Sequence, residues 1–551
     1  MMRWLTALNY LPVVGENKSI NKDMNGKNII ASTYVNANEK NLNAINPATG
    51  LAIEGDFFKA NESLVNDALA SATEAFQLYR SINKDLKAAF LNAVADEIAA
   101  ITEELVKRAA EESGLPLPRL QGEVGRTTGQ LRLFANLVAE GSWVNAIIET
   151  AQPDRQPLPK SDIRRMMIPI GPVVVFGASN FPLAFSVAGG DTASALASGC
   201  PVVVKAHPAH YGTSALVGEA IKKAVEKTNM PNGIFSMLYD DGYEIGAALV
   251  KHPLTKAVTF TGSFKGGMAL VKLADERENP IPVFAEMGSI NPVIFLPDAL
   301  TNKAEELAKK YAASISLGAG QFCTNPGLML AIESPSLTTF KKSLADAIAA
   351  VPSATMLTNG IADNYNRLAT EVINNDKASI LGISNLTDKD LKNQSKAIVA
   401  EISATEFIEN PEFREEIFGP YSLLVVAKDL SELESAISSL GGQLTATLMA
   451  DKEELKNYIS LLNKLTDKTG RIILNGVPTG VEVCASMQHG GPFPATNDSR
   501  FTSVGSTAIY RFVRPLAYQD WQQDLLPDEL KDGNPLNIFR TVNQKLTKAD
   551  E

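Results

Sequence analysis

The chain has few of the residues that form disulfide frameworks or metal sites. Its 551 residues include three cysteines, Cys200, Cys323 and Cys484, and four histidines. Three cysteines in so long a chain are no disulfide framework, and no Cys-x-x-Cys or Cys/His spacing is typical of a metal site. We therefore expect no metal ion and a reducing, cytoplasmic location. A catalytic Cys–His pair, as in cysteine proteases, would require the fold to bring one of the four histidines close to Cys323.

The chain also lacks an excess of positive charge and a long apolar run. It has 51 Lys and Arg against 62 Asp and Glu, a formal net charge of -11. Nucleic acids and anionic membranes favour basic patches, so neither is the expected partner. No apolar run reaches the roughly 18 residues that a membrane span needs. Residues 1–14 loosely resemble a signal peptide. We expect residues 1–23 to be a disordered or upstream extension, with secretion as the alternative.

The composition that remains is that of a globular protein with two or three domains, 45% hydrophobic and 21% charged. Helical patterns fill residues from about 45 to 150, and short apolar runs alternate with helical segments from residue 167 onward. Buried strands are expected at 167–176, 201–205, 234–238, 257–260 and 282–286. Strands that alternate with helices form a parallel sheet, so the predicted fold class is α/β.

Polar residues follow directly on four of the predicted strands. They are Asn180, Lys205, the turn 261–263 and Glu286. Ligands of parallel sheets bind outside the carboxyl ends of the strands, so these positions predict a cofactor site. No Gly-x-Gly-x-x-Gly motif supports it. Taken singly, Lys205 can simply extend to solvent and Glu286 can belong to a structural ion pair.

Cys323 lies in a glycine-rich turn, Ser316-Leu-Gly-Ala-Gly-Gln-Phe-Cys-Thr-Asn-Pro326. A thiol, a side-chain amide and a carboxylate are the groups needed for covalent chemistry on a carbonyl. The thiol attacks, the amide of Asn180 stabilises the oxyanion, and Glu286 moves a proton. The alternative is a structural cysteine, which is the interpretation that we prefer for Cys200 and Cys484.

Six motifs occur in an order that makes the chain resemble the aldehyde dehydrogenase superfamily. They are the Asn180 loop, Lys205 after a valine run, Phe260-Thr-Gly-Ser263, Glu286-Met-Gly288, Gly320-Gln-Phe-Cys323 and Glu416-Ile-Phe-Gly-Pro420. The resemblance covers residues from about 44 to about 515, and the separation of positions 286 and 323 is close to the family's usual spacing of base and nucleophile.

This resemblance implies an α/β aldehyde dehydrogenase-like fold with several parts. They are a parallel-sheet cofactor domain at 24–150 and 167–288, an α/β catalytic domain at 289–500, a small bridging, oligomerisation element at 151–166 and 505–525, and a C-terminal tail at 526–551. We expect the tail to be frayed after Asn543. Family members form dimers, some of them paired into tetramers, so a homodimer or homotetramer is expected.

The resemblance also implies residue roles in the NAD(P)-dependent oxidation of an aldehyde to an acid. Cys323 is the nucleophile, Asn180 and the Cys323 backbone N–H form the oxyanion hole, and Glu286 activates the water that hydrolyses the thioester. The implied cofactor contacts are Lys205 and Glu416 on ribose hydroxyls, Gly262 and Ser263 at the pyrophosphate, and Phe418 near the nicotinamide ribose.

A narrower resemblance points to the 2,5-dioxopentanoate (α-ketoglutaric semialdehyde) dehydrogenase branch. The segments that carry it are 205–210, 321–327, 480–484, 489–494 and 502–505. Such a substrate carries a carboxylate, so its pocket needs a cation or several donors. We expect Arg126 and Gln130, four residues apart on one helix face, and Phe181 to contact it. A salt bridge is the alternative for Arg126.

Pro208 indicates which cofactor is accepted. Many NAD-preferring members carry a glutamate at that position, three residues after the strand-end lysine, where it repels a 2′-phosphate. We therefore expect NADP to be accepted along with NAD, and His207 or His210 to assist the phosphate, with plain loop histidines as the alternative.

Rival functions remain open at this point. One is a CoA-acylating dehydrogenase, which Glu286 disfavours; another is a non-enzymatic role, which the presence of Cys323 and Asn180 disfavours. A third is oxidation of another semialdehyde or a fatty aldehyde, which the sequence distinguishes poorly because pocket shape decides.

Overall fold

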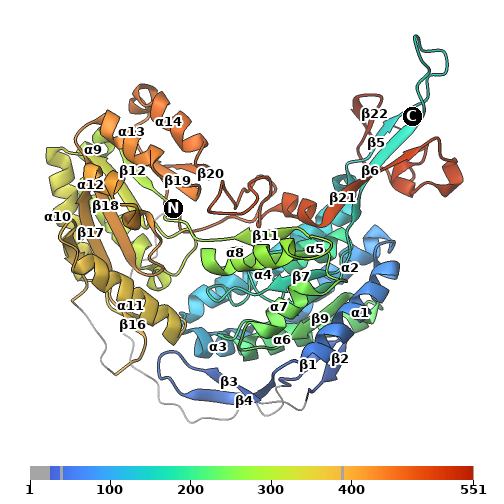
Figure 1. Cartoon of the computed structure of the whole chain (residues 1–551), viewed down its shortest axis with the longest axis horizontal. Coiled ribbons are helices and arrows are strands. Elements are labelled where there is room, and N and C mark those ends of the chain that lie inside the picture. The colour runs from blue at the N-terminus through green and yellow to red at the C-terminus, as the bar shows by residue number, and fades with distance from the viewer. Residues whose placement is uncertain (1–24, 38–40, 386–389, 550–551) are drawn as a thin grey trace.

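The computed structural model describes residues 25–37, 41–385 and 390–549, and three larger sheets organise this part of the chain (Figure 1). The extension expected at residues 1–23 lies outside the described residues. None of the described helices combines the length and the apolar character that a bilayer span requires. The alternating strands and helices confirm the predicted α/β class.

The first sheet holds the strand ends that we singled out from the sequence. Its strand order is β11-β10-β7-β8-β9-β1-β2. The bounds are β11 Val283–Glu286, β10 Ala257–Thr261, β7 Val173–Phe176, β8 Val202–Lys205, β9 Phe235–Leu238, β1 Asn28–Ile30 and β2 Thr33–Val35. Strands β7 to β11 run parallel, and β1 pairs antiparallel with β9. Because β8 and β10 both flank β7, the strand order reverses there, which is where sheets of this kind bind ligands.

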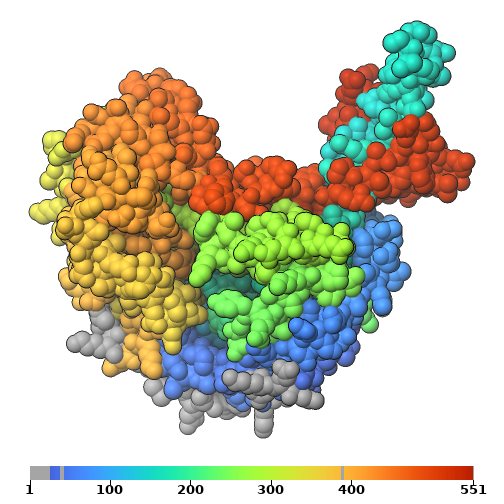
Figure 2. All heavy atoms as spheres, in the orientation of Figure 1, coloured from blue at the N-terminus to red at the C-terminus, as the bar shows by residue number. Residues whose placement is uncertain are grey.

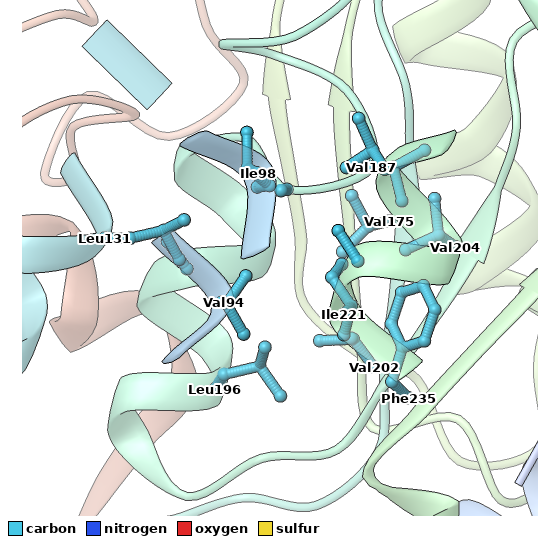
Figure 3. Close-up of a cluster of buried hydrophobic side chains, with 14 of the residues drawn as sticks. Val94, Ile98, Leu131, Val175, Val187, Leu196, Val202, Val204, Ile221 and Phe235 are labelled. Carbon is cyan, nitrogen blue, oxygen red and sulfur yellow. The ribbon is translucent and has the colours of Figure 1, made fainter. Parts of the chain in front are cut away.

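Helices cover both faces of this sheet because successive strand residues point to opposite sides. Val173 and Val175 of β7 pack on one face with helices α2 to α6, and Figure 3 shows part of this cluster around Val175. Val174 packs on the other face with α1, α7 and α8. The helices are α1 Glu62–Tyr79, α2 Lys84–Ala100, α3 Thr102–Ser113, α4 Leu117–Glu140, α5 Gly190–Ser198, α6 Tyr211–Lys227, α7 Glu244–Lys251 and α8 Phe264–Asp275. Each fully buried valine contributes about 1.5–3 kcal/mol.

The second sheet has the order β15-β17-β18-β13-β12-β19-β20. Its strands are β15 Ser379–Ile383, β17 Ile398–Ser403, β18 Tyr421–Ala427, β13 Leu328–Ile332, β12 Val293–Phe295, β19 Gln443–Met449 and β20 Thr469–Leu474. Helices α9 Pro297–Ser316 and α10 Pro335–Ala349 cover one face. The other face carries α11 Asn359–Ile373, α12 Ala404–Glu409, α13 Leu430–Ser438 and α14 Ile459–Thr466. Two small strand pairs are β3 Asn41–Ile45 with β4 Ala52–Phe58, and β14 Ala354–Thr355 with β16 Gln394–Ser395.

The third sheet stands away from the rest of the molecule as an arm, drawn in cyan and red (Figures 1 and 2). Its order is β21-β6-β5-β22-β23, with bounds β21 Val513–Gln519, β6 Ile163–Pro169, β5 Ile147–Glu149, β22 Arg540–Val542 and β23 Lys545–Thr547. The expectation of a frayed end after Asn543 is wrong for β23, which pairs with β22.

Two further expectations about element bounds were wrong for local reasons. The helical pattern expected from about 45 to 150 begins with a strand, β4, and continues as α1 to α4, where Asn61 and Asn83 cap the N-termini of α1 and α2 with a side-chain oxygen. The strand expected at 167–176 is β6 and β7, which belong to different sheets. Gly171 lies between them with a φ of 125°, a conformation that breaks a strand.

Candidate active site

The carboxyl ends of the parallel strands in the first sheet gather the polar residues predicted there. Asn180 follows β7, Lys205 ends β8, and Glu286 ends β11. The turn after β10 is joined to β11, since the Gly262 N–H donates to the Glu286 carbonyl at 3.0 Å. This arrangement confirms the predicted placement of these residues at one sheet edge.

The turn that carries Cys323 comes from the second sheet, just before β13. Its backbone has positive φ at Gly318, Ala319 and Gly320. A Cβ at position 320 would lie 2.1 Å from the Gly419 carbonyl oxygen, so the close approach of the two backbones requires glycine. The Asn291 side-chain amide then holds the turn by donating to the Cys323 carbonyl at 2.8 Å.

Asn180 is bound to this turn although it follows a strand of the other sheet. Its Nδ2 donates to the Gln321 carbonyl at 3.1 Å. Helix α4 fixes its loop from the other side, because Arg119 Nη2 donates to the Asn180 carbonyl at 2.7 Å. The Glu123 carboxylate accepts the backbone N–H groups of residues 183 and 184. The structure thus joins the loop of the predicted amide to the turn that carries the predicted thiol.

The buried side chains of Glu286 and His489 form a compact cluster with the half-buried Cys323. Cys323 Sγ lies 3.4 Å from His489 Nε2, which lies 2.9 Å from Glu286 Oε1. The Ser503 hydroxyl donates to the second Glu286 oxygen. His489 and Ser503 were not among the predicted site residues, although both lie in segments that carried the narrower resemblance. The scarcity of histidine was the only signal for His489.

The charges in this cluster favour an ionised acid beside a protonated thiol. Burial raises the pKa of the Cys323 thiol well above its usual range, and repulsion from Glu286 raises it further. Burial also acts to raise the pKa of Glu286, but attraction to His489 and hydrogen bonds from His489, Ser503 and Cys323 bring it below its ordinary value. Attack by the sulfur therefore requires a group that removes its proton.

Aromatic rings and arginines line the approach to Cys323. Phe181 meets Phe322 edge to face at 5.5 Å, and the Arg119 guanidinium stacks on both rings. The Arg126 guanidinium lies 5.2 Å from the ring of Phe185 and 5.8 Å from that of Phe181. The predicted substrate contacts Phe181 and Arg126 therefore lie together beside the thiol.

Arg126 also lines a pocket of about 590 Å³ between α4 and residues 481–483. Its Nε and Nη2 are buried and have no hydrogen-bond partner within residues 25–37, 41–385 and 390–549. Burial lowers the pKa of Arg126 while Cys323 and nearby carboxylates oppose this, and a guanidinium stays charged at neutral pH. Open donors on a buried cation are costly unless a ligand accepts them.

Gln130, the other polar residue predicted to contact substrate, lies one turn farther along α4. It is buried and packs against Gly190, where an added Cβ would lie 2.2 Å from its Nε2 and 3.1 Å from the Ser503 carbonyl. Its side chain thus lies toward the Glu286 end of the site and not among the residues that line the pocket.

Comparison with known proteins agrees with this geometry. The model of the aldehyde dehydrogenase family matches residues 34–493. The chain belongs to the aldehyde dehydrogenase family. It is 50% identical over 523 residues to alpha-ketoglutaric semialdehyde dehydrogenase 2 of Azospirillum brasilense, covering 95% of this chain and 99% of the relative. It is 46% identical to an alpha-ketoglutaric semialdehyde dehydrogenase of Acinetobacter baylyi, with the same coverage.

Solved structures of the family share the fold. Betaine aldehyde dehydrogenase of Staphylococcus aureus, determined in complex with NAD⁺, has a TM-score of 0.78 at 20% identity and covers 90% of this chain and 95% of that chain. The predicted family and fold are confirmed.

The residues predicted to contact the cofactor lie around the edge of the first sheet. Lys205 is buried and donates to the Asp240 carbonyl at 3.2 Å. Ser263 caps the N-terminus of α8 by accepting the Gly266 N–H. Glu416 packs against Gly288, and burial raises its pKa to about 7. Glu416 and Phe418 line one hollow with Phe322, next to Cys323.

The two histidines after β8 differ in what they can offer a ligand. They stack with ring centres 5.4 Å apart. His210 is buried, and both of its ring nitrogens lie against protein groups, the Ala178 carbonyl at 2.9 Å and the Ser214 hydroxyl at 3.3 Å. The half-buried His207 accepts the Ala209 N–H on Nδ1, so its Nε2 carries the proton and can donate. Of the two, only His207 is suited to assist a phosphate.

Proposed function

We propose that this protein oxidises 2,5-dioxopentanoate (α-ketoglutaric semialdehyde) to 2-oxoglutarate through a thioester on Cys323. The observation that carries the substrate assignment is Arg126, which lines the pocket, interacts electrostatically with Cys323 and has two buried donors without a partner among the described residues. A substrate carboxylate can accept two hydrogen bonds from such a group. The names of the two relatives that are 50% and 46% identical support the same substrate.

The first chemical step is attack of Cys323 on the aldehyde carbon. Because the thiol is protonated at rest, its proton must leave, and the ionised Glu286 carboxylate, which accepts a hydrogen bond from the thiol, is placed to take it. The Asn180 side-chain amide and the Cys323 backbone N–H then stabilise the oxyanion, the largest contribution that fixed donors make to such reactions. Asn180 is held for this task by Arg119 and the Gln321 carbonyl.

Glu286 serves the later step, in which water hydrolyses the thioester. Its lowered pKa leaves it ionised at neutral pH, so that it can take a proton from the attacking water. Ser503 and His489 hold the carboxylate in position. This residue also favours hydrolysis over acyl transfer to CoA.

The residues at the edge of the first sheet fit a nicotinamide dinucleotide. A helix N-terminus such as that of α8 at Ser263 binds phosphate. Position 262 favours glycine, because a Cβ there would lie 2.5 Å from the Phe260 ring. Lys205 and Glu416 would hold the ribose hydroxyls, and Phe418 would pack beside the nicotinamide ribose. When bound, the cofactor supplies the hydride acceptor that the oxidation needs.

We infer further that NADP is accepted as well as NAD. Pro208 stands at the position where many NAD-preferring family members carry a glutamate, and His207 Nε2 can donate to a 2′-phosphate. Steady-state kinetics with both cofactors test this inference, which a strict NAD preference would contradict.

The domain boundaries and the oligomeric state are part of the same proposal. The predicted cofactor domain comprises 24–150 and 167–288 and the predicted catalytic domain 289–500. The arm that contains the predicted bridging segments 151–166 and 505–525 also includes β5, the end of β6, β22 and β23. Leu158, Trp521 and Leu525 expose much of their surface on the arm, as a contact between copies requires. Light scattering is expected to give a dimer or tetramer, and the mass of one 59.1 kDa chain would contradict this.

Replacing Arg126 tests the substrate assignment. Arg126→Gln should raise the KM for 2,5-dioxopentanoate about 10–100-fold, because a hydrogen bond to a charged group contributes about 1.5–3 kcal/mol. The KM for pentanal, which has no carboxylate, should change little. Cofactor reduction followed by absorbance measures both.

Arg132→Gln is the matched control. Arg132 lines the same pocket, but its guanidinium is paired with Asp96 at 2.7 Å. The control should therefore bind the dioxo acid nearly as the parent does. Equal effects of the two replacements, or faster turnover of succinate or glutarate semialdehyde by the parent, would overturn the assignment.

A further inference from the structure

Three groups of the site that differ in chemistry can converge on one cation. Glu286, Cys323 and His489 each offer one ligand atom, and these atoms all lie within 4.8 Å of one another. We propose that the three side chains form a site for a soft divalent cation such as Zn²⁺, and that its occupation inhibits the enzyme. No local motif indicates this site, because its members come from three distant segments.

The distances between the ligand atoms suit a tetrahedral ion. Zn–S bonds of about 2.3 Å and Zn–N and Zn–O bonds of about 2.0–2.1 Å place S and N about 3.6 Å apart and N and O about 3.3 Å apart. The corresponding separations here are 3.4 Å from Cys323 Sγ to His489 Nε2 and 2.9 Å from that nitrogen to Glu286 Oε1. Movements of a few tenths of an ångström bring these two separations to the tetrahedral values. The third pair, Cys323 Sγ and a Glu286 oxygen, lies within 4.8 Å, and water can take the fourth position.

The three ligand types, and the hydrogen bond that orients one of them, favour a particular kind of ion. Thiolate and imidazole favour Zn²⁺ over Mg²⁺ or Ca²⁺, which prefer oxygen ligands. The thiolate and the carboxylate together balance the charge of a divalent ion. Ser503 donates to the Glu286 oxygen that does not face His489, and outer hydrogen bonds of this kind orient ligating carboxylates in metal sites.

Arg126 opposes the cation. Its positive charge acts on both Cys323 and Glu286, so it weakens binding of any metal there. Arg126 therefore has opposite effects on the two ligands. Arg126→Gln should weaken binding of the substrate carboxylate and strengthen binding of the metal ion. Inhibition follows because a bound ion occupies the thiol that attacks and the acid that activates water, a consequence that rests on the proposed function.

Titration of the full-length protein with Co²⁺, without aldehyde or cofactor, tests the binding itself. A thiolate–cobalt charge-transfer band in the near ultraviolet should appear and then disappear on addition of Zn²⁺. Cys323→Ser should abolish the band, and His489→Gln should weaken binding at least about 10–100-fold, the loss typical of even an outer partner. Ser503→Ala should weaken it within that range, and Arg126→Gln should strengthen it.

Cys484→Ser is the control, because Cys484 is a partly exposed free thiol whose nearest polar partner is the Ser486 hydroxyl at 3.6 Å. A band that survives Cys323→Ser, or that disappears in Cys484→Ser, would overturn the site. Zn²⁺ should also inhibit turnover reversibly with a chelator, and binding without inhibition would overturn the inhibitory role. If the protein binds cobalt but does not oxidise the dioxo acid, the metal site stands and the proposed function is refuted.

Discussion

Glu112 and Glu286 are both buried acids beside a basic side chain, and they lie in the same half of the molecule. Glu112 is 3.0 Å from Arg108 Nη2 and accepts the backbone N–H groups of Gly212 and Thr213 at the start of α6. The Thr213 hydroxyl donates to it as well. Each partner is a fixed donor, so the carboxylate ties α3 to α6.

Glu286 is as deeply buried but has partners that can change their protonation or react. They are the His489 imidazole and the Cys323 thiol, whereas its third partner, the Ser503 hydroxyl, is a fixed donor like that of Thr213. The comparison teaches that burial with a cation does not distinguish a structural acid from a catalytic one. The chemistry of the surrounding groups does.

The pair of variants Glu286→Gln and Glu112→Gln separates the two roles. Glu286→Gln should lower kcat about 10²–10⁴-fold, the contribution typical of a positioned general base, with little change in the urea midpoint. Glu112→Gln should lower the free energy of unfolding by about 3–5 kcal/mol, because it leaves Arg108 buried and without its charge partner. Its kcat under native conditions should stay close to that of the parent.

Urea denaturation and steady-state assays on the same preparations measure both quantities. The proposed difference between a structural and a catalytic acid would be contradicted if Glu112→Gln reduced kcat as strongly as Glu286→Gln does. It would also be contradicted if the two variants lost equal stability.

The residues at strand ends could be predicted from the sequence because a local pattern determines them. Apolar runs that end in Lys205 or Glu286 define parallel strands, and their carboxyl ends must share an edge. The glycines around Cys323 likewise indicated a tight turn, and the structure shows one with positive φ. The fold class and the thiol, acid and amide followed from such patterns.

Long-range partners could not be predicted in this way. His489 meets Cys323 across 166 residues, and Ser503 meets Glu286 across 217. Only packing of the second sheet and the segment after β20 against the first sheet brings them together. Arg119 was missed for the same reason, since nothing in α4 indicates that it holds the Asn180 loop. Gln130 was placed correctly on its helix, but its neighbours depend on Gly190 in a distant segment.

A smaller effect should appear in the pH dependence of Cys323 alkylation. Because the thiol pKa is raised, its reaction with iodoacetamide should keep accelerating above about pH 8.5, the ordinary thiol value. Glu286→Gln removes a negative charge that raises this pKa, so the profile should move to lower pH and the rate at neutral pH should increase. Glu112→Gln should leave the profile unchanged, because that charge is not among those that act on the thiol. Mass spectrometry of the Cys323 peptide measures the rates, and identical profiles for the parent and Glu286→Gln would show that the carboxylate does not control the thiol.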